Sequence, residues 1–253
     1  MFKGFYNLTS GMLSQSRRLD IIANNMTNIS TPGFKSEHYT DTTFRDVMIS
    51  RVGNLDKGNL QELGNQSYIL APDELYTDFA QSSLEQTGLS LDFAIQGEGF
   101  FAVQTNNNNQ IGYTRSGSFT LDNEGYLCLN GLGRVLSDQG EPIQLPTDLI
   151  NADETGALFT SDVQQGFLGR IGVYAFPDNQ QLERNENGLF VGNGAQLNTE
   201  AVIHHRTIER SNVNMIQEMI SMMSAQRALQ SAAQMSRIYD QIITKATTDL
   251  GRP

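Results

Sequence analysis

The sequence has one cysteine, Cys128, no tryptophan and only three histidines in 253 residues. A single cysteine excludes an intramolecular disulfide and any metal site built from several cysteines. His204 and His205 are adjacent, so on a strand they would point to opposite faces and could not bind one metal ion together. Cys128 lies in an apolar stretch typical of a strand and is interpreted as a small buried residue. We therefore expect no metal site.

Basic residues are also scarce, with 17 Lys and Arg against 28 Asp and Glu and a formal net charge of −11. Such a chain has no general attraction for nucleic acid or anionic lipid. It contains no apolar run of 18 residues, and its first ten residues lack the unbroken apolar core of a signal peptide. We expect neither nucleic-acid binding nor insertion into a membrane.

Catalytic motifs are missing as well. Gly97-Glu98-Gly99 and Gly131-Leu132-Gly133 begin like a dinucleotide-binding loop, but neither has the third glycine or opens a helix. No nucleophile stands beside a base, and no pair of carboxylates suggests acid–base chemistry. The sequence therefore predicts no cofactor, no catalytic residue and no enzyme.

Glycine and proline are distributed unevenly along the chain. Of 23 glycines, 16 lie between Gly88 and Gly194 and none between Gly194 and Gly251, while residues 1–31 and 178–252 contain no proline. Since both residues interrupt helices, this distribution favours a helix at each end and many turns in the middle. Short apolar stretches with turn residues every 8–12 positions, including the turn Asp122–Gly125, predict an antiparallel barrel or sandwich there.

The first segment carries a heptad pattern, with seven of eight positions apolar from residue 5 to residue 29. Such a pattern predicts a helix that packs against other helices. Asn28, Pro32 and Gly33 then end the helix, because Pro32 disfavours helical geometry at Thr31 and Gly33 permits a left-handed turn.

The last segment predicts a second helix over 212–246, capped by Ser211 or Asn212. Alanines in its apolar pattern would let a neighbouring helix approach closely. We name the apolar residues of both helices the assembly seam: Phe5, Leu8, Met12, Leu19, Ile22, Met26, Ile29, Val213, Ile216, Ile220, Met223, Ala228, Met235 and Ile242.

The predicted fold is therefore α+β. Long N- and C-terminal helices pair in a coiled-coil-like bundle, and a central antiparallel all-β domain lies between them along the chain. Four parts are expected: an N-terminal helix in 1–35, an extended connector in 36–83, the β domain in 84–205 and a C-terminal helix in 206–253. A local helix is expected around 73–84 of the connector.

Three groups of residues resemble the axial proteins of the bacterial flagellum, and among these the rod proteins of the basal body. The N-terminal group is Ser10-Gly11-Met12, Gln15, Arg18-Leu19-Asp20, Ile22-Ala23-Asn24-Asn25, Asn28, Thr31 and Gly33-Phe34-Lys35. The central group is Leu91-Asp92-Phe93-Ala94-Ile95, Gly97, Gly99-Phe100-Phe101, Tyr113-Thr114-Arg115, Gly117 and Phe119. The C-terminal group is Ser211-Asn212-Val213, Glu218-Met219 and Ala225-Gln226-Arg227-Ala228, whereas Met26-Thr27 stands where the family more usually has Leu-Ala.

The resemblance implies a structural subunit that self-assembles into a helical tube and transmits torque from motor to hook. It implies copies of the same chain and other flagellar rod and hook proteins as partners. It also implies a place in the basal body, reached by export across the cytoplasmic membrane without a cleaved signal peptide. The length suits the longer rod proteins, of either the distal or the proximal type.

Two other classes of function compete with the structural subunit. A β-domain adhesive or carbohydrate-binding module on a helical stalk would account for the heptads and the β domain, but not for the terminal motifs. An enzyme acting on peptidoglycan would need an acid–base carboxylate in a cleft, for which the sequence has no candidate.

Overall fold

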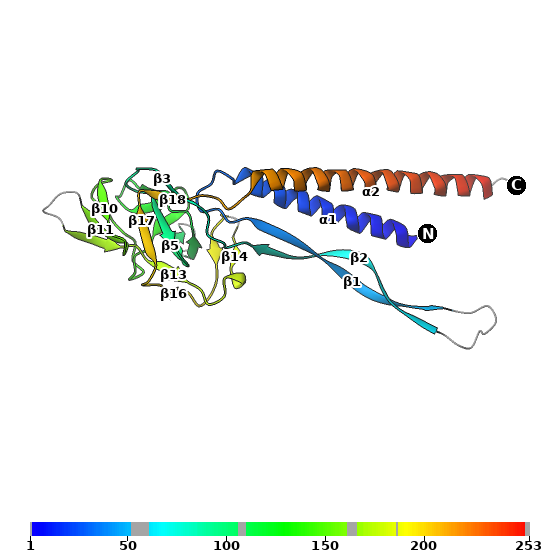
Figure 1. The fold of residues 1–253 in the computed structure, drawn as a ribbon, viewed down its shortest axis with the longest axis horizontal. Coiled ribbons are helices and arrows are strands. Elements are labelled where there is room, and N and C mark those ends of the chain that lie inside the picture. The colour runs from blue at the N-terminus through cyan, green and yellow to red at the C-terminus, as the bar shows by residue number, and fades with distance from the viewer. Residues whose placement is uncertain (1, 52–60, 106–109, 161–165, 186, 251–253) are drawn as a thin grey trace. The chain divides into compact units, whose positions relative to one another are not determined.

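The computed structural model describes residues 2–51, 61–105, 110–160, 166–185 and 187–250. The protein is α+β, with a helix near each end and antiparallel strands between them (Figure 1). The chain divides into two compact units, which we call the helical unit and the β unit. The helical unit comprises Met1–Thr27, Glu37–Tyr76 and Asn214–Pro253, and the β unit comprises Asn28–Ser36 and Thr77–Val213.

The helical unit contains both long helices and a two-stranded ribbon. Helix α1 (Phe2–Thr27) and helix α2 (Met215–Leu250) lie side by side and run in opposite directions (Figure 1). Strands β1 (Glu37–Arg51) and β2 (Gln61–Thr77) pair with each other. The local helix expected around 73–84 is wrong, because β2 continues to Thr77 and strand β3 already begins at Leu84. Among the described residues, no helix combines the length and apolar character needed to cross a bilayer.

A turn containing Gly33 follows the end of α1, and an asparagine side chain caps the start of α2. Helix α1 ends at Thr27, just before the turn that the sequence predicts, and Gly33 has a positive φ of 67°. The predicted caps of α2, Ser211 and Asn212, are wrong. Its cap is Asn214, whose Oδ1 accepts hydrogen bonds from the backbone N–H groups of Ile216 and Gln217 at 3.1 and 3.3 Å.

The β unit is built from short strands. These are β3 (Leu84–Gln86), β4 (Phe93–Gln96), β5 (Phe100–Thr105), β6 (Ile111–Thr114), β7 (Phe119–Leu121), β8 (Leu127–Leu129), β9 (Gly133–Val135), β10 (Ile150–Ala152), β11 (Ala157–Thr160), β12 (Phe167–Arg170), β13 (Val173–Ala175), β14 (Glu183–Arg184), β15 (Phe190–Val191), β16 (Gln196–Leu197), β17 (Val202–His205) and β18 (Thr207–Glu209). A short 3-10 helix, η1 (Asn179–Gln181), precedes β14.

The largest sheet has the order β14-β15-β6-β5-β9-β8-β7, with β13 also paired to β5 and to β16. Smaller sheets are β10-β11-β12, β17-β4 and β18-β3, and the pairings are antiparallel, as the sequence predicts. The turn Asp122–Gly125 joins β7 to β8, which confirms the predicted hairpin. The core contains inward-facing residues of several sheets, among them Phe93, Ile95, Phe101, Val103, Leu127 and Leu158.

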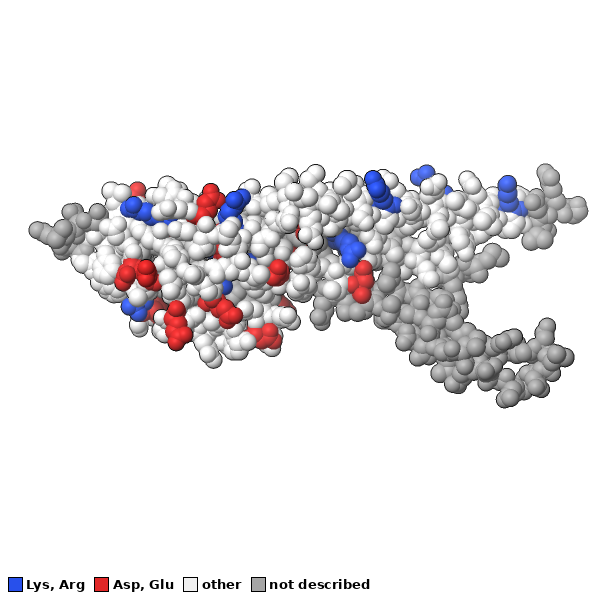
Figure 2. Space-filling model, in the orientation of Figure 1, with Lys and Arg blue, Asp and Glu red and all other residues white. Residues whose placement is uncertain are grey.

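Charge is distributed unevenly along the chain. Segments 1–27 and 214–253 carry seven Lys and Arg against four Asp and Glu, a net charge of +3. Segments 28–36 and 77–213, which form the β unit, carry seven against 17, a net charge of −10. Figure 2 shows basic side chains spaced along α2 and acidic ones over the visible face of the β unit. The acidity of the chain therefore lies mainly in the β unit.

Candidate assembly surface

Helices α1 and α2 meet through small and apolar residues. Ile22 of α1 and Ala225 of α2 are both buried. A Cβ atom added to Gly4 would lie 2.7 Å from the hydroxyl oxygen of Tyr239, so the two helices are close at that point. Ala225, and not the seam residue Ala228, is the buried alanine, since Ala228 is exposed.

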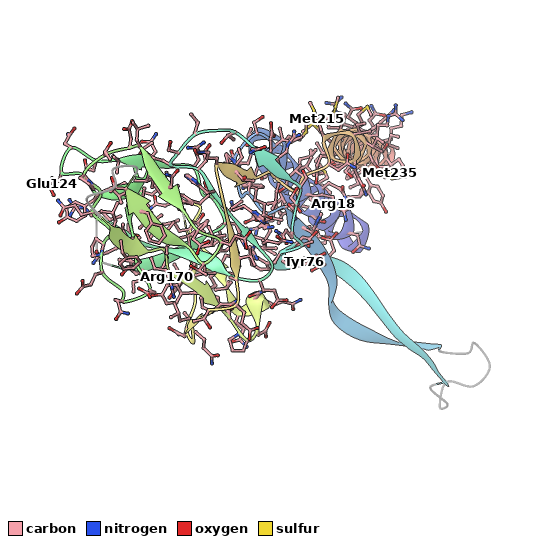
Figure 3. All side chains as sticks on the ribbon, turned by 60° about the vertical axis from the view of Figure 1, so that its left-hand side comes forward. Arg18, Tyr76, Glu124, Arg170, Met215 and Met235 are labelled. Carbon is pink, nitrogen blue, oxygen red and sulfur yellow. The ribbon has the colours of Figure 1, made fainter. Side chains whose placement is uncertain are left out.

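The opposite side of α2 carries large apolar side chains that the chain itself does not cover. We call this set the outer apolar face: Ile216, Met219, Ile220, Met223, Met235, Ile238 and Ile242, each at least 46% exposed. Met235 is labelled on α2 in Figure 3. At 100° per residue, Ile216, Ile220 and Met223 point roughly 140–180° away from Ala225. The helix therefore buries one face and exposes another.

The predicted seam residues do not form a single surface within one chain. In α1, Ile22 is buried, Phe5 is exposed, and Leu8, Met12, Leu19 and Met26 are half-buried. Ile29 and Val213 belong to the β unit, where Ile29 is half-buried and Val213 is buried. The remaining seam residues, Ile216, Ile220, Met223, Ala228, Met235 and Ile242, are exposed.

A buried amide, which the sequence-based reasoning missed, joins three segments of the helical unit. Asn25 of α1 is 1% exposed. Its Oδ1 accepts a hydrogen bond from the backbone N–H of Glu37 at 3.0 Å, and its Nδ2 donates to the Glu37 carbonyl at 2.9 Å and to Glu218 Oε1 at 3.2 Å. Asn25 thus fixes α1 to the start of β1 and to the first turns of α2. In the sequence, Asn24 and Asn25 stand out only as members of the N-terminal group that resembles flagellar rod proteins.

A second contact joins α1 to β1. Ser14, also buried, donates a hydrogen bond from Oγ to Asp41 Oδ1 at 2.5 Å. Ser14 and Asn25 lie 11 residues apart on α1, which is three helical turns at about 3.6 residues per turn. The two polar side chains therefore hold the same face of α1 against one strand.

The β unit contains a buried ionic cluster of Lys35, Arg115 and Glu209. Lys35 Nζ lies 2.7 Å from Glu209 Oε1, and Arg115 Nη1 lies 3.4 Å from Glu209 Oε2. Lys35 also donates to the Ala80 carbonyl at 2.7 Å, and the backbone N–H of Ser82 donates to Glu209 Oε1 at 2.9 Å. One carboxylate therefore holds the segments around residues 35, 82 and 115 together.

Burial lowers the pKa of both cations in this cluster. For Lys35 the removal of water lowers the pKa, and the charge and hydrogen bond of Glu209 oppose this shift. Burial also lowers the pKa of Arg115, and the charge and hydrogen bond of Glu209 again oppose this shift. Glu209 thus supplies the negative charge that is in direct contact with both buried cations.

Gly33 approaches this cluster so closely that only glycine fits. A Cβ at Gly33 would lie 2.2 Å from the Ser116 backbone nitrogen, and the Gly33 N–H donates to the Glu209 carbonyl at 2.7 Å. We expect Gly33→Ala to destabilise the β unit by at least ~3 kcal/mol, because steric clash adds to the cost of a left-handed alanine. Gly131→Ala is the matched control, since Gly131 has a φ of 75° and open space around its Cα. Urea unfolding followed by circular dichroism measures both, and equal losses of stability would contradict the close approach.

The two neighbouring histidines and the cysteine are placed in the β unit without a common site. His204 Nε2 lies 2.6 Å from Gln96 Oε1, while His205 Nε2 lies 2.8 Å from the Ser90 carbonyl oxygen and its ring stacks on Phe93. Cys128 is half-buried in β8, and burial raises the pKa of its thiol. These residues have structural contacts rather than a shared reactive geometry.

Three segments match known protein families. Residues 5–35 match the family described as "Flagella basal body rod protein". Residues 94–162 match "Flagellar hook protein FlgE/F/G D1 domain", and residues 205–249 match "Flagellar basal body rod FlgEFG protein C-terminal". The first and third matches include Asn25 and Glu218, which bond to each other in the helical unit.

Curated relatives are similar over nearly their whole length. The flagellar basal-body rod protein FlgF of Caulobacter vibrioides is 30% identical, over 100% of this chain and 99% of its own. The flagellar basal-body rod protein FlgG of Buchnera aphidicola subsp. Acyrthosiphon pisum is 30% identical, over 93% and 95%, and FlgG of Bacillus subtilis is 28% identical, over 96% and 97%. The resemblance seen in the sequence is thus confirmed, and the chain belongs to the flagellar basal-body rod protein family.

Proposed function

We propose that this chain, a structural subunit of the flagellar basal-body rod, assembles with copies of itself through its two terminal helices. In the assembly the helices pack in a coiled-coil-like manner into a tube, and other flagellar rod and hook proteins continue it. The observation that carries the proposal is the outer apolar face of α2, which lies opposite the side that contacts α1.

The energetic argument rests on the size of that face. A soluble protein rarely exposes seven large apolar side chains along one helix unless they serve as a binding surface. Burying one such side chain contributes roughly 1.5–3 kcal/mol, and the same contact recurs in every subunit of a repeating assembly. The half-buried residues of α1, such as Leu8 and Met12, add to the surface. The proposal involves no catalytic step, in keeping with a family of structural proteins.

Ile220→Asp tests this proposal. Ile220 is 58% exposed in one chain, so we expect the thermal unfolding of the monomer to change little. In the assembly the substitution would bury an unpaired carboxylate, and we expect rods and swimming to be lost.

Ile220→Leu is the matched control, because it keeps an apolar side chain of the same volume and should swim normally. Swimming assays and electron microscopy of isolated basal bodies measure both variants. Normal rods built from the Ile220→Asp chain would refute assembly through this face.

A further inference from the structure

The chain passes between the helical unit and the β unit at four places, after residues 27, 36, 76 and 213. Beside three of these places lie short parts of the β unit, residues 33–36, 78–83 and 209–212. We call them the first, second and third junction segments. A pull on the helical unit is transmitted along the covalent chain, so it reaches the β unit at these segments.

Every pair of junction segments is joined by hydrogen bonds. The Gly33 N–H of the first segment donates to the Glu209 carbonyl of the third at 2.7 Å. The Asp78 N–H of the second segment donates to the Ser36 carbonyl of the first at 2.9 Å. The Ser82 N–H of the second segment donates to Glu209 Oε1 of the third at 2.9 Å. The three segments therefore form one bonded group.

The side chain of Asn212, in the third segment, binds both of the other segments. Its Oδ1 accepts a hydrogen bond from the Ser36 N–H at 2.7 Å, and its Nδ2 donates to the Asp78 carbonyl at 2.8 Å. Together with the bond between Asp78 and Ser36, these contacts close a ring through all three segments. Bonds that lie side by side under force share that force and must break together. A pull on one junction segment is therefore shared by the other two.

The junction segments are also attached to the core of the β unit. The ring of Phe79, in the second segment, packs edge-on against Phe100 of β5 and Phe190 of β15, with ring centroids 5.7 and 5.1 Å apart. Both strands belong to the largest sheet. Arg115, which follows β6 of the same sheet, pairs with Glu209 of the third segment. Force that is shared among the junction segments therefore passes into the largest sheet.

We propose that Asn212 distributes mechanical force among the junction segments and so lets the β unit withstand the torque that the rod transmits. This inference rests on the proposed function, and adds to it a residue through which a single subunit resists force. Asn212 is half-buried and uncharged, so its replacement breaks the ring without leaving a buried charge unpaired. The role of the ring can therefore be measured in a chain that still folds.

Stretching single molecules of the full chain at constant force tests this role. With handles at the two termini, the force enters the β unit at residues 28 and 213. We expect Asn212→Ala to make the β unit rupture roughly tenfold faster at the same force, because two hydrogen bonds of the ring are lost.

Asn198→Ala is the matched control for this measurement. Asn198 is also half-buried and also has two side-chain hydrogen bonds, with the Glu98 carbonyl at 2.9 Å and the Glu200 N–H at 3.0 Å. Because it lies outside the junction segments, its replacement should leave the rupture rate nearly unchanged. Equal acceleration by the two substitutions would contradict a special role of Asn212.

A second direction of pull separates a mechanical role from a general loss of stability. Handles at the exposed positions Leu149 and Leu197 apply force across the β unit at points outside the junction segments. In that direction the Asn212→Ala chain should rupture at nearly the original rate. Equal acceleration in both directions, or none with the terminal handles, would overturn the inference.

A second variant keeps part of the contact. Asn212→Asp retains the acceptor for the Ser36 N–H and loses the donor to the Asp78 carbonyl, so we expect it to rupture faster than the original chain when pulled from the termini. An unchanged rate would show that force is not shared through both bonds. Since single chains are stretched, a negative result leaves the proposed assembly through the outer apolar face intact, and Ile220→Asp tests that assembly separately.

Discussion

Asn25→Asp is expected to destabilise the packing of both helices in the helical unit. The new carboxylate cannot donate to the Glu37 carbonyl or to Glu218, and it places a negative charge beside the Glu218 carboxylate in a buried position. Unpaired buried charges of this kind cost about 3–5 kcal/mol. Amide hydrogen exchange in α1 and at the start of β1 should accelerate by more than about 100-fold, while the β unit keeps its protection.

The neighbouring residue supplies the control for this experiment. Asn24→Asp makes the same chemical change one position earlier, where the side chain is exposed. We expect hydrogen exchange in α1 to be nearly unchanged in that variant. If the two variants exchange at equal rates, Asn25 does not hold the three segments together.

Glu209→Gln is expected to lower the stability of the β unit more than any surface substitution. It leaves the charges of Lys35 and Arg115 buried without a counterion, which costs about 3–5 kcal/mol. Glu85→Gln is the control, since Glu85 pairs with Arg210 in an exposed contact at 3.6 Å, and such pairs contribute little. Urea unfolding at neutral pH compares the two variants, and similar losses of stability would show that the cluster is not important for the fold.

The pH dependence of the Glu209→Gln variant gives an independent check. The pKa of Lys35 in the folded protein lies below its ordinary value of 10.5, and removing Glu209 lowers it further. Between the lowered pKa of Lys35 in the folded chain and its ordinary pKa in the unfolded chain, the unfolded chain binds more protons. The free energy of unfolding therefore rises with pH in this window. We expect the variant to recover stability as the pH approaches 10.5, over a wider window than the original chain. A loss of stability over that range would contradict the assignment.

Much of the architecture could be predicted from local sequence. The scarcity of glycine and proline near the ends indicates the helices, Asn28 and Gly33 mark the end of α1, and the turn Asp122–Gly125 marks a hairpin. These features act through backbone conformation within a few residues, so a single sequence carries them. The boundaries of the four predicted domains stay predictions.

The contacts between distant residues could not be predicted in the same way. Asn25 and Glu218 are 193 residues apart, and Lys35 and Glu209 are 174 apart. Each of these polar residues would look like a surface residue in its own segment, because burial depends on partners that local patterns do not reveal. The cap at Asn214 was missed because Ser211, Asn212 and Asn214 are all good caps, and Asn212 is used instead to bond the Ser36 N–H and the Asp78 carbonyl.

Helices α1 and α2, which pack together, are synthesised at opposite ends of the chain and therefore at different times. Helix α1 is complete at residue 27, but the helix that covers its buried face begins only at residue 215. Many strands of the β unit pair with neighbours in sequence, such as β7 with β8 and β10 with β11, and local pairing is fast. A chain that leaves the ribosome N-terminus first can therefore form these hairpins while Ile22 is still uncovered. The first segment made is therefore among the last to be packed, and its apolar side chains stay uncovered by their own helix partner until α2 has been made.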